Sequence, residues 1–385
     1  MTRRERLMAT LRGEPVDRTA VCFYEIGGFR VDPANPDPFN IYNAPSWQPL
    51  LRMAEEQTDL IRMRGPGVQP TANNPRSALF KTEVSHRDGA RFEQTTVRVG
   101  GRTLTSLTRR DPGVDTIWQI EHLLKDEDDL RAYLELPPEV FEYAVNVAPL
   151  IAEDRELGDR GIIMVDTPDP LCLAAGLFSM ETYTLLAFAE RALFHRLLEK
   201  LAPALHARTA QVARDFPGHL WRIFGPEYAT PPYLPPALFE EYVVRYTGPM
   251  VAMIQRHGGF ARIHCHGRIR DVLPHIVGMG ASALDPIEPP PQGDVTLAEV
   301  RRQYGRELVL FGNLEIADIE NLPPPAFETI VARALREGTA GPGRGMVLMP
   351  SACPYGRTIT PTTLANYTTM VRLAGAWEAS PRLPA

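Results

Sequence analysis

The sequence has little lysine and little cysteine, and it has no long hydrophobic run. Three lysines stand against 38 arginines in 385 residues. The four cysteines, at positions 22, 172, 265 and 353, show no short-range pairing pattern, which excludes the disulfide framework of a small secreted protein. No apolar stretch is long enough to cross a bilayer. We therefore predict reduced thiols, a cytoplasmic location and no membrane partner.

Charge of one sign is not concentrated anywhere along the chain. The formal net charge is −6, and the sequence contains no block of lysine and arginine. The absence of such a block argues against a nucleic acid or an anionic membrane surface as the main partner. The hydrophobic fraction of 44% is enough for a sizeable core. This composition favours small molecules or other proteins as partners.

Short apolar segments alternate with helical stretches along most of the sequence. Such alternation is typical of parallel strands joined by helical crossovers. Eight strands of this kind predict a single α/β domain over residues 1–385, a (β/α)8 TIM-type barrel with an N-terminal helical extension. The eight expected strands are Ala20–Glu25, Asp59–Met63, Gly161–Asp166, His219–Phe224, Ala261–His266, Ala281–Ile287, Glu307–Phe311 and Gly345–Met349.

Residues 82–120 interrupt this alternation with two runs that have a hydrophobic period of two. One run is Arg91–Val99, the other is Arg102–Leu107, and Gly100-Gly101 lies between them. A Gly-Gly turn between two such runs is typical of an antiparallel hairpin. We therefore predict a β-hairpin insertion at 82–120, between the second and third barrel strands.

A candidate metal site is formed by the His-x-His-Gly sequence that ends an apolar run and by Cys353, which follows another. Residues two apart in a strand face the same side, so His264 and His266 would be presented together. Two histidines and one thiolate are a usual catalytic zinc set, with a fourth position open for substrate. The alternatives are hydrogen-bonded histidines at a strand end and a cysteine that packs as a small hydrophobic residue.

Polar residues follow most of the expected strands, at the carboxyl ends where barrel enzymes place their catalytic groups. We predict catalytic roles for Asp166 and Glu227, which end or follow the third and fourth strands. Glu227 would serve as a fourth zinc ligand or as a proton donor. We predict that Tyr24, Glu25 and Asn313 bind the substrate.

Each of these five residues also has a structural explanation. Glu227 could cap the next helix, and Asp166 could fix its own loop in an Asx turn. Tyr24 could fill the barrel, and Glu25 could form a salt bridge at the rim. Asn313 could stabilise its own turn. The sequence leaves these alternatives open.

Three segments carry a resemblance to a known superfamily. They are Arg4 to Arg18 near the start, Gly312-Asn313-Leu314-Glu315, and Thr360 to Asn366 near the end. Together they resemble the uroporphyrinogen decarboxylase superfamily over nearly the whole chain, which implies a barrel of the predicted kind. One branch of that superfamily decarboxylates porphyrinogens without a cofactor. Another branch consists of zinc-dependent methyltransferases that work with corrinoid proteins.

The methyltransferase branch typically has His-x-Cys-Gly after its fifth strand and a further cysteine after its eighth. The matching positions here are His264, His266 and Cys353, so a histidine replaces the middle cysteine. The resemblance implies Zn²⁺ as a cofactor and a corrinoid (cobalamin), free or bound to a protein, as methyl acceptor or donor. It also implies a small methylated substrate, for which we expect a methoxylated aromatic that undergoes O-demethylation.

The decarboxylase branch grips the carboxylates of its substrate with an arginine-rich N-terminal segment. The corresponding segment here, Val21–Gly28, carries Glu25 and no arginine. A tetrapyrrole with many carboxylates would therefore meet too little positive charge. A metal-free uroporphyrinogen-type decarboxylase is the second hypothesis.

Overall fold

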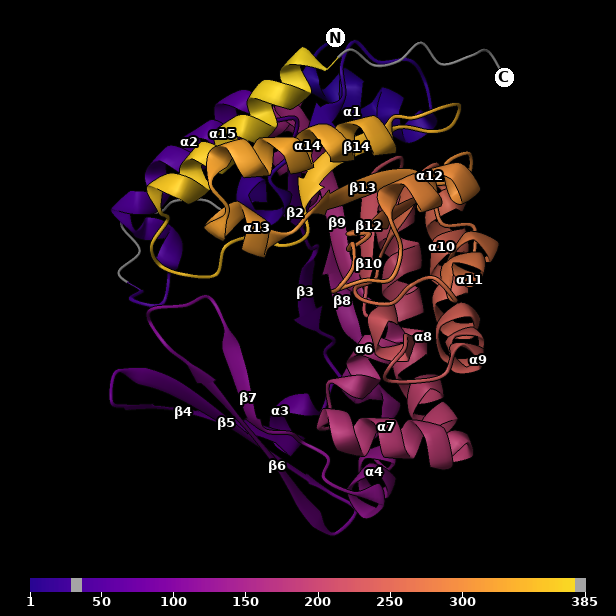
Figure 1. Cartoon of the computed structure of the whole chain (residues 1–385). Coiled ribbons are helices and arrows are strands. Elements are labelled where there is room, and N and C mark those ends of the chain that lie inside the picture. The colour runs from indigo at the N-terminus through magenta and orange to yellow at the C-terminus, as the bar shows by residue number, and fades with distance from the viewer. Residues whose placement is uncertain (29–36, 378–385) are drawn as a thin grey trace.

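The computed structural model of the chain describes residues 1–28 and 37–377. Its centre is an eight-stranded parallel sheet with the strand order β1-β14-β13-β12-β11-β10-β9-β2, surrounded by helices (Figure 1). This confirms the predicted TIM-type α/β barrel. The strands are β1 (Ala20–Val21), β2 (Leu60–Arg64), β9 (Gly161–Pro168), β10 (Leu220–Phe224), β11 (Phe260–His264), β12 (Ala283–Asp285), β13 (Val309–Leu314) and β14 (Met346–Pro350).

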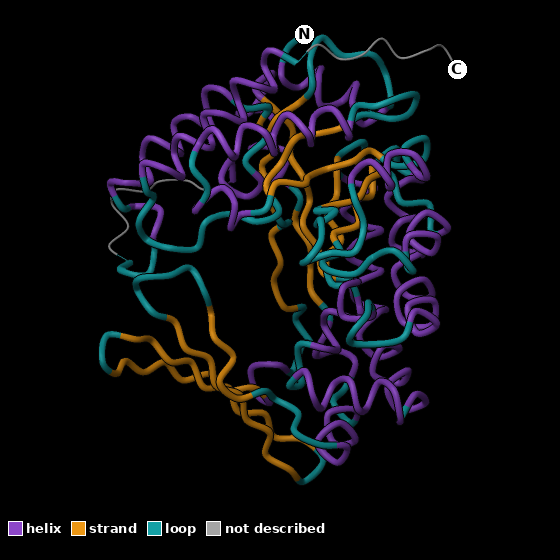
Figure 2. Tube along the Cα trace, in the orientation of Figure 1, coloured by secondary structure: helices purple, strands orange, loops and turns teal. Residues whose placement is uncertain are grey.

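The helices lie mainly on the outside of the barrel, between consecutive strands (Figure 2). None of those in the described ranges is both long and apolar enough to span a membrane. The α-helices are α1 (Arg3–Arg12), α2 (Gln48–Gln57), α3 (Arg76–Leu79), α4 (Glu127–Leu134), α5 (Ala148–Leu157), α6 (Pro170–Ala175), α7 (Met180–Ala189), α8 (Arg191–Asp215), α9 (Pro236–Phe239), α10 (Arg245–Arg256), α11 (Leu273–Gly278), α12 (Leu297–Tyr304), α13 (Ile316–Asn321), α14 (Pro324–Gly338) and α15 (Pro361–Ala376).

All eight predicted strands are present, but three of them end earlier than predicted. The sixth ends at Asp285 instead of Ile287. The first strand stops at Val21 instead of Glu25, and residues 24–28 form a 3-10 turn. Tyr24 has a left-handed backbone with φ 54°, so the chain cannot continue there as a strand. The fifth strand ends at His264, which leaves His266 just beyond the sheet.

The insertion between the second and third barrel strands is larger than the predicted hairpin. Strands β5 (Ala90–Val99) and β6 (Arg102–Arg110) form the hairpin around Gly100-Gly101, and β4 (Phe80–Arg87) and β7 (Ile117–Glu121) extend it to four antiparallel strands. The sequence did not reveal β4 because its side chains are largely exposed on both faces, so hydrophobic residues do not alternate. A separate pair, β3 (Gly67–Pro70) and β8 (Tyr143–Asn146), flanks the insertion.

Helix α1 closes the amino-terminal end of the barrel. Its buried Leu7 and Leu11 belong to one apolar cluster with the residues that point into the barrel, such as Leu220 and Val347. The outer faces of the strands pack with the surrounding helices in a second, larger cluster. The amino-terminal end is therefore filled with apolar side chains, and polar groups inside the barrel lie nearer the carboxyl ends.

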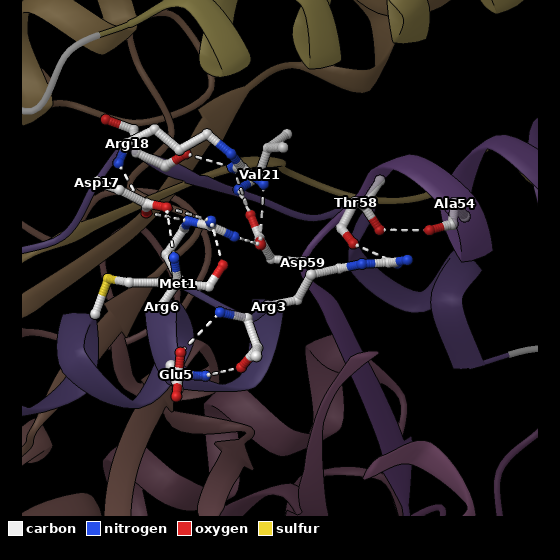
Figure 3. A network of polar contacts seen from close by, with 12 residues as sticks. Met1, Arg3, Glu5, Arg6, Asp17, Arg18, Val21, Ala54, Thr58 and Asp59 are labelled. Atoms are coloured by element: carbon white, nitrogen blue, oxygen red, sulfur yellow. Dashed lines mark hydrogen bonds and ion pairs between the residues drawn. The ribbon is translucent and has the colours of Figure 1, made fainter. Parts of the chain in front are cut away.

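Asp59 joins the two ends of the sheet, β1 and β2. Its backbone N–H donates to the Val21 carbonyl at 2.7 Å, and its Oδ2 accepts from the Val21 N–H at 3.0 Å. The fully buried carboxylate also forms ion pairs with Arg6 at 2.6 Å and Arg18 at 2.7 Å (Figure 3). Asp17 binds the same Arg6 from the exposed side at 2.6 Å. A charged network therefore holds α1, β1 and β2 together.

Candidate functional site at the barrel mouth

An open pocket of about 300 Å³ lies at the carboxyl ends of the barrel strands. All three predicted metal ligands line it, together with Glu227 and two of the three predicted substrate-binding residues. Asp166 and Asn313 are not among its lining residues. The pocket is lined by Tyr24, Glu25, Arg222, Phe224, Glu227, His264, His266, Ser351, Ala352 and Cys353.

His264 ends β11 and is oriented by a buried carboxylate. Its Nδ1 lies 2.7 Å from Oδ2 of Asp285, the last residue of the neighbouring strand β12. The other oxygen of Asp285 pairs with Arg262 at 3.0 Å, deep inside the barrel. Burial raises the pKa of Asp285, but the charges of Arg262 and His264 outweigh it and bring that pKa to about 2. The carboxylate therefore stays ionised and leaves Nε2 of His264 as the nitrogen available to a ligand.

His266 lies two residues after the end of β11 and is also oriented by a carboxylate. Its Nδ1 lies 2.8 Å from Oε1 of Glu288, whose Oε2 accepts from the backbone N–H of Gly267 at 2.7 Å. Partial burial lowers the pKa of His266, whereas the hydrogen bond and charge of Glu288 raise it further, so its pKa lies above the usual value. The two imidazole rings are 4.6 Å apart between centroids and nearly perpendicular. Both histidines thus face a carboxylate through Nδ1.

Cys353 follows β14 and lies on the same pocket, in contact with Glu25. Its Sγ is 3.5 Å from Oε2 of Glu25. Burial, followed by the charge of Glu25, raises the pKa of the thiol well above its usual value. The thiol is therefore protonated at neutral pH, and it faces a carboxylate rather than the imidazoles.

Arg222 on β10 lines the pocket and contacts several other residues around it. Its Nε pairs with Asp166 at 2.7 Å and its Nη1 pairs with Glu25 at 3.2 Å, while Nη1 also donates to the Tyr24 hydroxyl. The guanidinium lies 5.5 Å from the ring centroid of Tyr24 and 5.1 Å from that of Phe224. Three residues predicted from the sequence are thus connected through an arginine that was not predicted.

Glu227 and Asn313 are held by backbone groups. Oε2 of Glu227 accepts from the N–H of Gly225 at 3.1 Å, so the carboxylate stabilises its own turn while it lines the pocket. Nδ2 of Asn313 donates to the carbonyl of Ile287 at 3.2 Å, which connects the loops after β12 and β13. The predicted functional roles of both residues stay predictions, and each also has a structural contact.

The part of the sequence that carries most of this site matches a known family. The model of the family described as uroporphyrinogen decarboxylase (URO-D) covers residues 115–377, more than half of the chain. The chain belongs to the uroporphyrinogen decarboxylase family. The match includes six of the eight residues predicted as metal ligands, catalytic or substrate-binding groups, and only Tyr24 and Glu25 lie before it.

The fold of this uroporphyrinogen decarboxylase family member is similar to that of a methyltransferase from Methanosarcina mazei. The TM-score is 0.58 at 16% sequence identity, over 98% of this chain and 99% of that chain. A D-psicose 3-epimerase solved in the presence of D-fructose matches with a TM-score of 0.29 and 13% identity, over 64% of this chain and 83% of that chain. The first likeness shows the fold, and the second is too weak to support a conclusion. No curated protein matches the sequence significantly.

The predicted zinc ligands of this family member can be compared with what a zinc site requires. Within residues 1–28 and 37–377, no three His, Cys, Asp or Glu side chains are gathered closely enough to hold a metal ion. The donor chemistry nevertheless suits zinc, because His264 and His266 keep Nε2 available and Cys353 lines the same pocket. Metal binding would require the Cys353 thiol to lose its proton and its contact with Glu25.

Four charged residues of the site were missed by the sequence interpretation. They are Arg222, Arg262, Asp285 and Glu288. A signal for one of them was present, because Arg262 lies two residues before His264 and therefore faces the same side of β11. An arginine on the inward face of a barrel strand requires a buried carboxylate partner, which Asp285 supplies.

The stability of this family member is expected to depend on pH because of one buried acid, Asp169. Asp169 is fully buried and accepts hydrogen bonds from the Cys172 N–H at 2.6 Å and the Thr247 hydroxyl at 3.0 Å. Burial raises its pKa to about 7. Because the folded state then binds the proton more tightly than the unfolded state, this group's contribution to stability falls as pH rises from about 4 to about 7.

We expect Asp169→Asn to remove this contribution, since the neutral amide still accepts from Cys172 and can donate to Thr247. The difference in unfolding free energy between the two proteins should change by roughly 1.4 kcal/mol for each unit of the pKa shift between pH 4 and 7. Urea titrations of both proteins at several pH values measure it. A difference that is constant with pH would show that Asp169 does not titrate in this range.

Proposed function

We propose that the protein is a zinc-dependent methyltransferase that transfers a methyl group from a small methylated donor, a methoxylated aromatic, to a corrinoid. The observation that carries this proposal is the pair of imidazoles at the mouth, each held through Nδ1 by a carboxylate and sharing a pocket with Cys353. A carboxylate on the second nitrogen is the usual support of a metal-binding histidine. Membership of the uroporphyrinogen decarboxylase family and a fold like that of a methyltransferase support the same function.

The charges around the pocket favour a bound cation. Carboxylates outnumber arginines there, which leaves an excess of negative charge next to the two histidines. The carboxylates are Glu25, Asp166, Asp285 and Glu288, and the arginines are Arg222 and Arg262. We propose that His264, His266 and Cys353 hold the ion. Zinc bound there would supply a Lewis acid for the oxygen that leaves when the methyl group is transferred.

The chain's own residues orient the ligands and handle the proton. Asp285 and Glu288 fix the two imidazole rings, and Arg262 keeps Asp285 ionised. In the transfer, the methyl carbon exchanges its bond to the ether oxygen for a bond to Co(I), which provides the electron pair. The departing oxygen then takes a proton, for which we propose Glu227 as the donor because it lines the pocket.

The aromatic side chains of the pocket support an aromatic substrate. Tyr24 and Phe224 both line the wall, and the guanidinium of Arg222 lies within 5.5 Å of both ring centroids. Since Arg222 pairs with Asp166 and Glu25, it holds this wall in place. A flat phenyl ring with a methoxy group can lie against such a wall, with its oxygen directed toward the histidines.

A metal-free decarboxylase is the second candidate, and Arg222 is the observation that favours it. This arginine lines the pocket and could bind a substrate carboxylate. Two carboxylates of the protein already pair with it, however, at 2.7 Å and 3.2 Å. A substrate that carries several carboxylates would meet more negative than positive charge, so we place this candidate second.

Methyl transfer can be followed directly in the zinc-loaded protein. We expect Co(I) cobalamin to be converted to methylcobalamin, seen in its absorption spectrum, when a methoxylated aromatic is added. The same mixture with the corresponding hydroxylated aromatic should stay unchanged, because it has no methyl group to give. If no methylated donor gives methylcobalamin and a porphyrinogen carboxylate loses CO₂ without metal, the decarboxylase is the correct function.

A further inference from the structure

A second cavity, of about 440 Å³, lies outside the barrel and shares no lining residue with the mouth. One wall comes from the inserted segment, which contributes β3, α3, α4 and β8. The other wall comes from α6, α8 and the turn between α6 and α7 (Figure 1). The proposed function does not use this cavity. Its volume is in the range of pockets that enclose small organic ligands.

The cavity is mainly apolar and aromatic. Tyr133 and Leu205 are buried lining residues, and the Phe141 ring lies beside that of Tyr133. Tyr143 and Leu173 are both 37% exposed, so they form a rim through which a ligand can enter. Apolar walls with a partly exposed rim are suited to the body of an apolar small molecule.

Two arginines provide the polar part of the lining, and no acidic residue lines the cavity. Arg208 on α8 donates to the Thr167 hydroxyl at 2.8 Å, and the guanidinium of Arg76 lies 4.0 Å from the ring centroid of Phe80. Neither arginine forms an ion pair within the described part of the chain. Burial lowers the pKa of Arg208, and the charge of Asp166 offsets this only in part.

The arginines that lie buried inside the barrel have carboxylate partners. Arg222 pairs with Asp166, and Arg262 pairs with Asp285. Two arginines that share one apolar cavity without such a partner are therefore a site for an external anion, because their forked N–H groups match a carboxylate. The Tyr133 hydroxyl, on the same lining, has no hydrogen-bond partner among the described residues.

We propose that this cavity binds a small apolar carboxylate. The aromatic or aliphatic body of the ligand lies against Tyr133, Phe141 and Leu205, and its carboxylate is bound by Arg76 and Arg208. The site is separate from the barrel mouth, so its occupancy is measured as binding and does not depend on the proposed methyl transfer.

Calorimetric titration of the full chain with naphthalene-2-carboxylate tests the proposal. We expect saturable binding of one molecule per chain, and binding at least about tenfold weaker for the uncharged naphthalene-2-carboxamide, since charge-assisted hydrogen bonds are the stronger kind. Arg208→Gln and Arg76→Gln should each weaken binding of the carboxylate by a similar factor. They should leave binding of the carboxamide nearly unchanged.

Two further variants separate this cavity from other sites and from loss of the fold. Ala204→Phe fills the cavity from α8 and should abolish binding, whereas Arg196→Gln, on an exposed position of the same helix, should have no effect. Circular dichroism checks that each variant is folded. Absence of binding by the unmodified chain, equal binding of acid and amide, or full binding by folded Ala204→Phe would each overturn the proposal.

Discussion

Replacing His266 or Cys353 with alanine is expected to lower methyl transfer and zinc affinity by more than about a hundredfold, because losing only a supporting residue of a metal ligand already costs about 10–100-fold. His266 is the better choice of the two histidines for this experiment. Its side chain is 37% exposed, whereas that of His264 is 7% exposed and contacts the buried Asp285. A folding defect is therefore less of a concern at His266.

The chain offers a matched control for each of these two variants. Cys172 is a free and partly buried cysteine like Cys353, but it does not line the mouth. His206 is a partly buried histidine whose Nε2 contacts the carbonyl of Tyr246 on α10, away from the pocket. We expect Cys172→Ala and His206→Ala to keep zinc and turnover. Equal losses in the controls and the site variants would mean that the losses come from the fold and not from ligation.

Replacing Asp59 with alanine is expected to lower the free energy of unfolding by about 3–5 kcal/mol, the cost of removing one partner from a buried ion pair. The carboxylate of Asp59 is fully buried, and its loss removes the partner of Arg6 Nη1, of Arg18 and of the Val21 N–H. Because these contacts join β1 to β2, the loss acts on the closure of the barrel. Urea denaturation followed by circular dichroism measures the change.

Asp17→Ala is the control, since Asp17 binds the same Arg6 at the same distance of 2.6 Å. Its side chain is 42% exposed, so water screens the pair and its loss should cost less than about 1 kcal/mol. The hydrogen bond from Arg6 holds the pKa of Asp17 below its usual value, so even this small contribution disappears in acid. Similar costs for the two variants would contradict the role given to Asp59.

The barrel could be predicted from the sequence because its strands form continuous apolar runs between helical segments. Residues of the candidate site could be predicted only where they end or follow a strand, as His264 and Glu227 do. Arg222 was missed because an arginine inside an apolar run gives no indication of its partner, and its partner Asp166 lies on another strand. Strand β4 was missed because a two-sided exposed strand has no hydrophobic period.

Side-chain contacts in the structure also changed the interpretation of residues that the sequence had predicted correctly as part of the pocket, such as Glu25. Glu25 was predicted to bind substrate or to form a rim salt bridge, and the structure shows it between Arg222 and Cys353. Such contacts depend on strand register and on side-chain rotamers, which one sequence does not determine. The charge balance of the mouth, which supports a bound cation, therefore became visible only in the structure.

The metal content of the freshly purified, untagged protein tests the central claim most directly. Mass spectrometry calibrated per polypeptide should find close to one zinc ion per chain, and His266→Ala should lose it. Such a result would show that the imidazoles and the thiol gather around a metal. No bound zinc, even after reconstitution with zinc, would contradict the proposed methyltransferase and favour the metal-free decarboxylase.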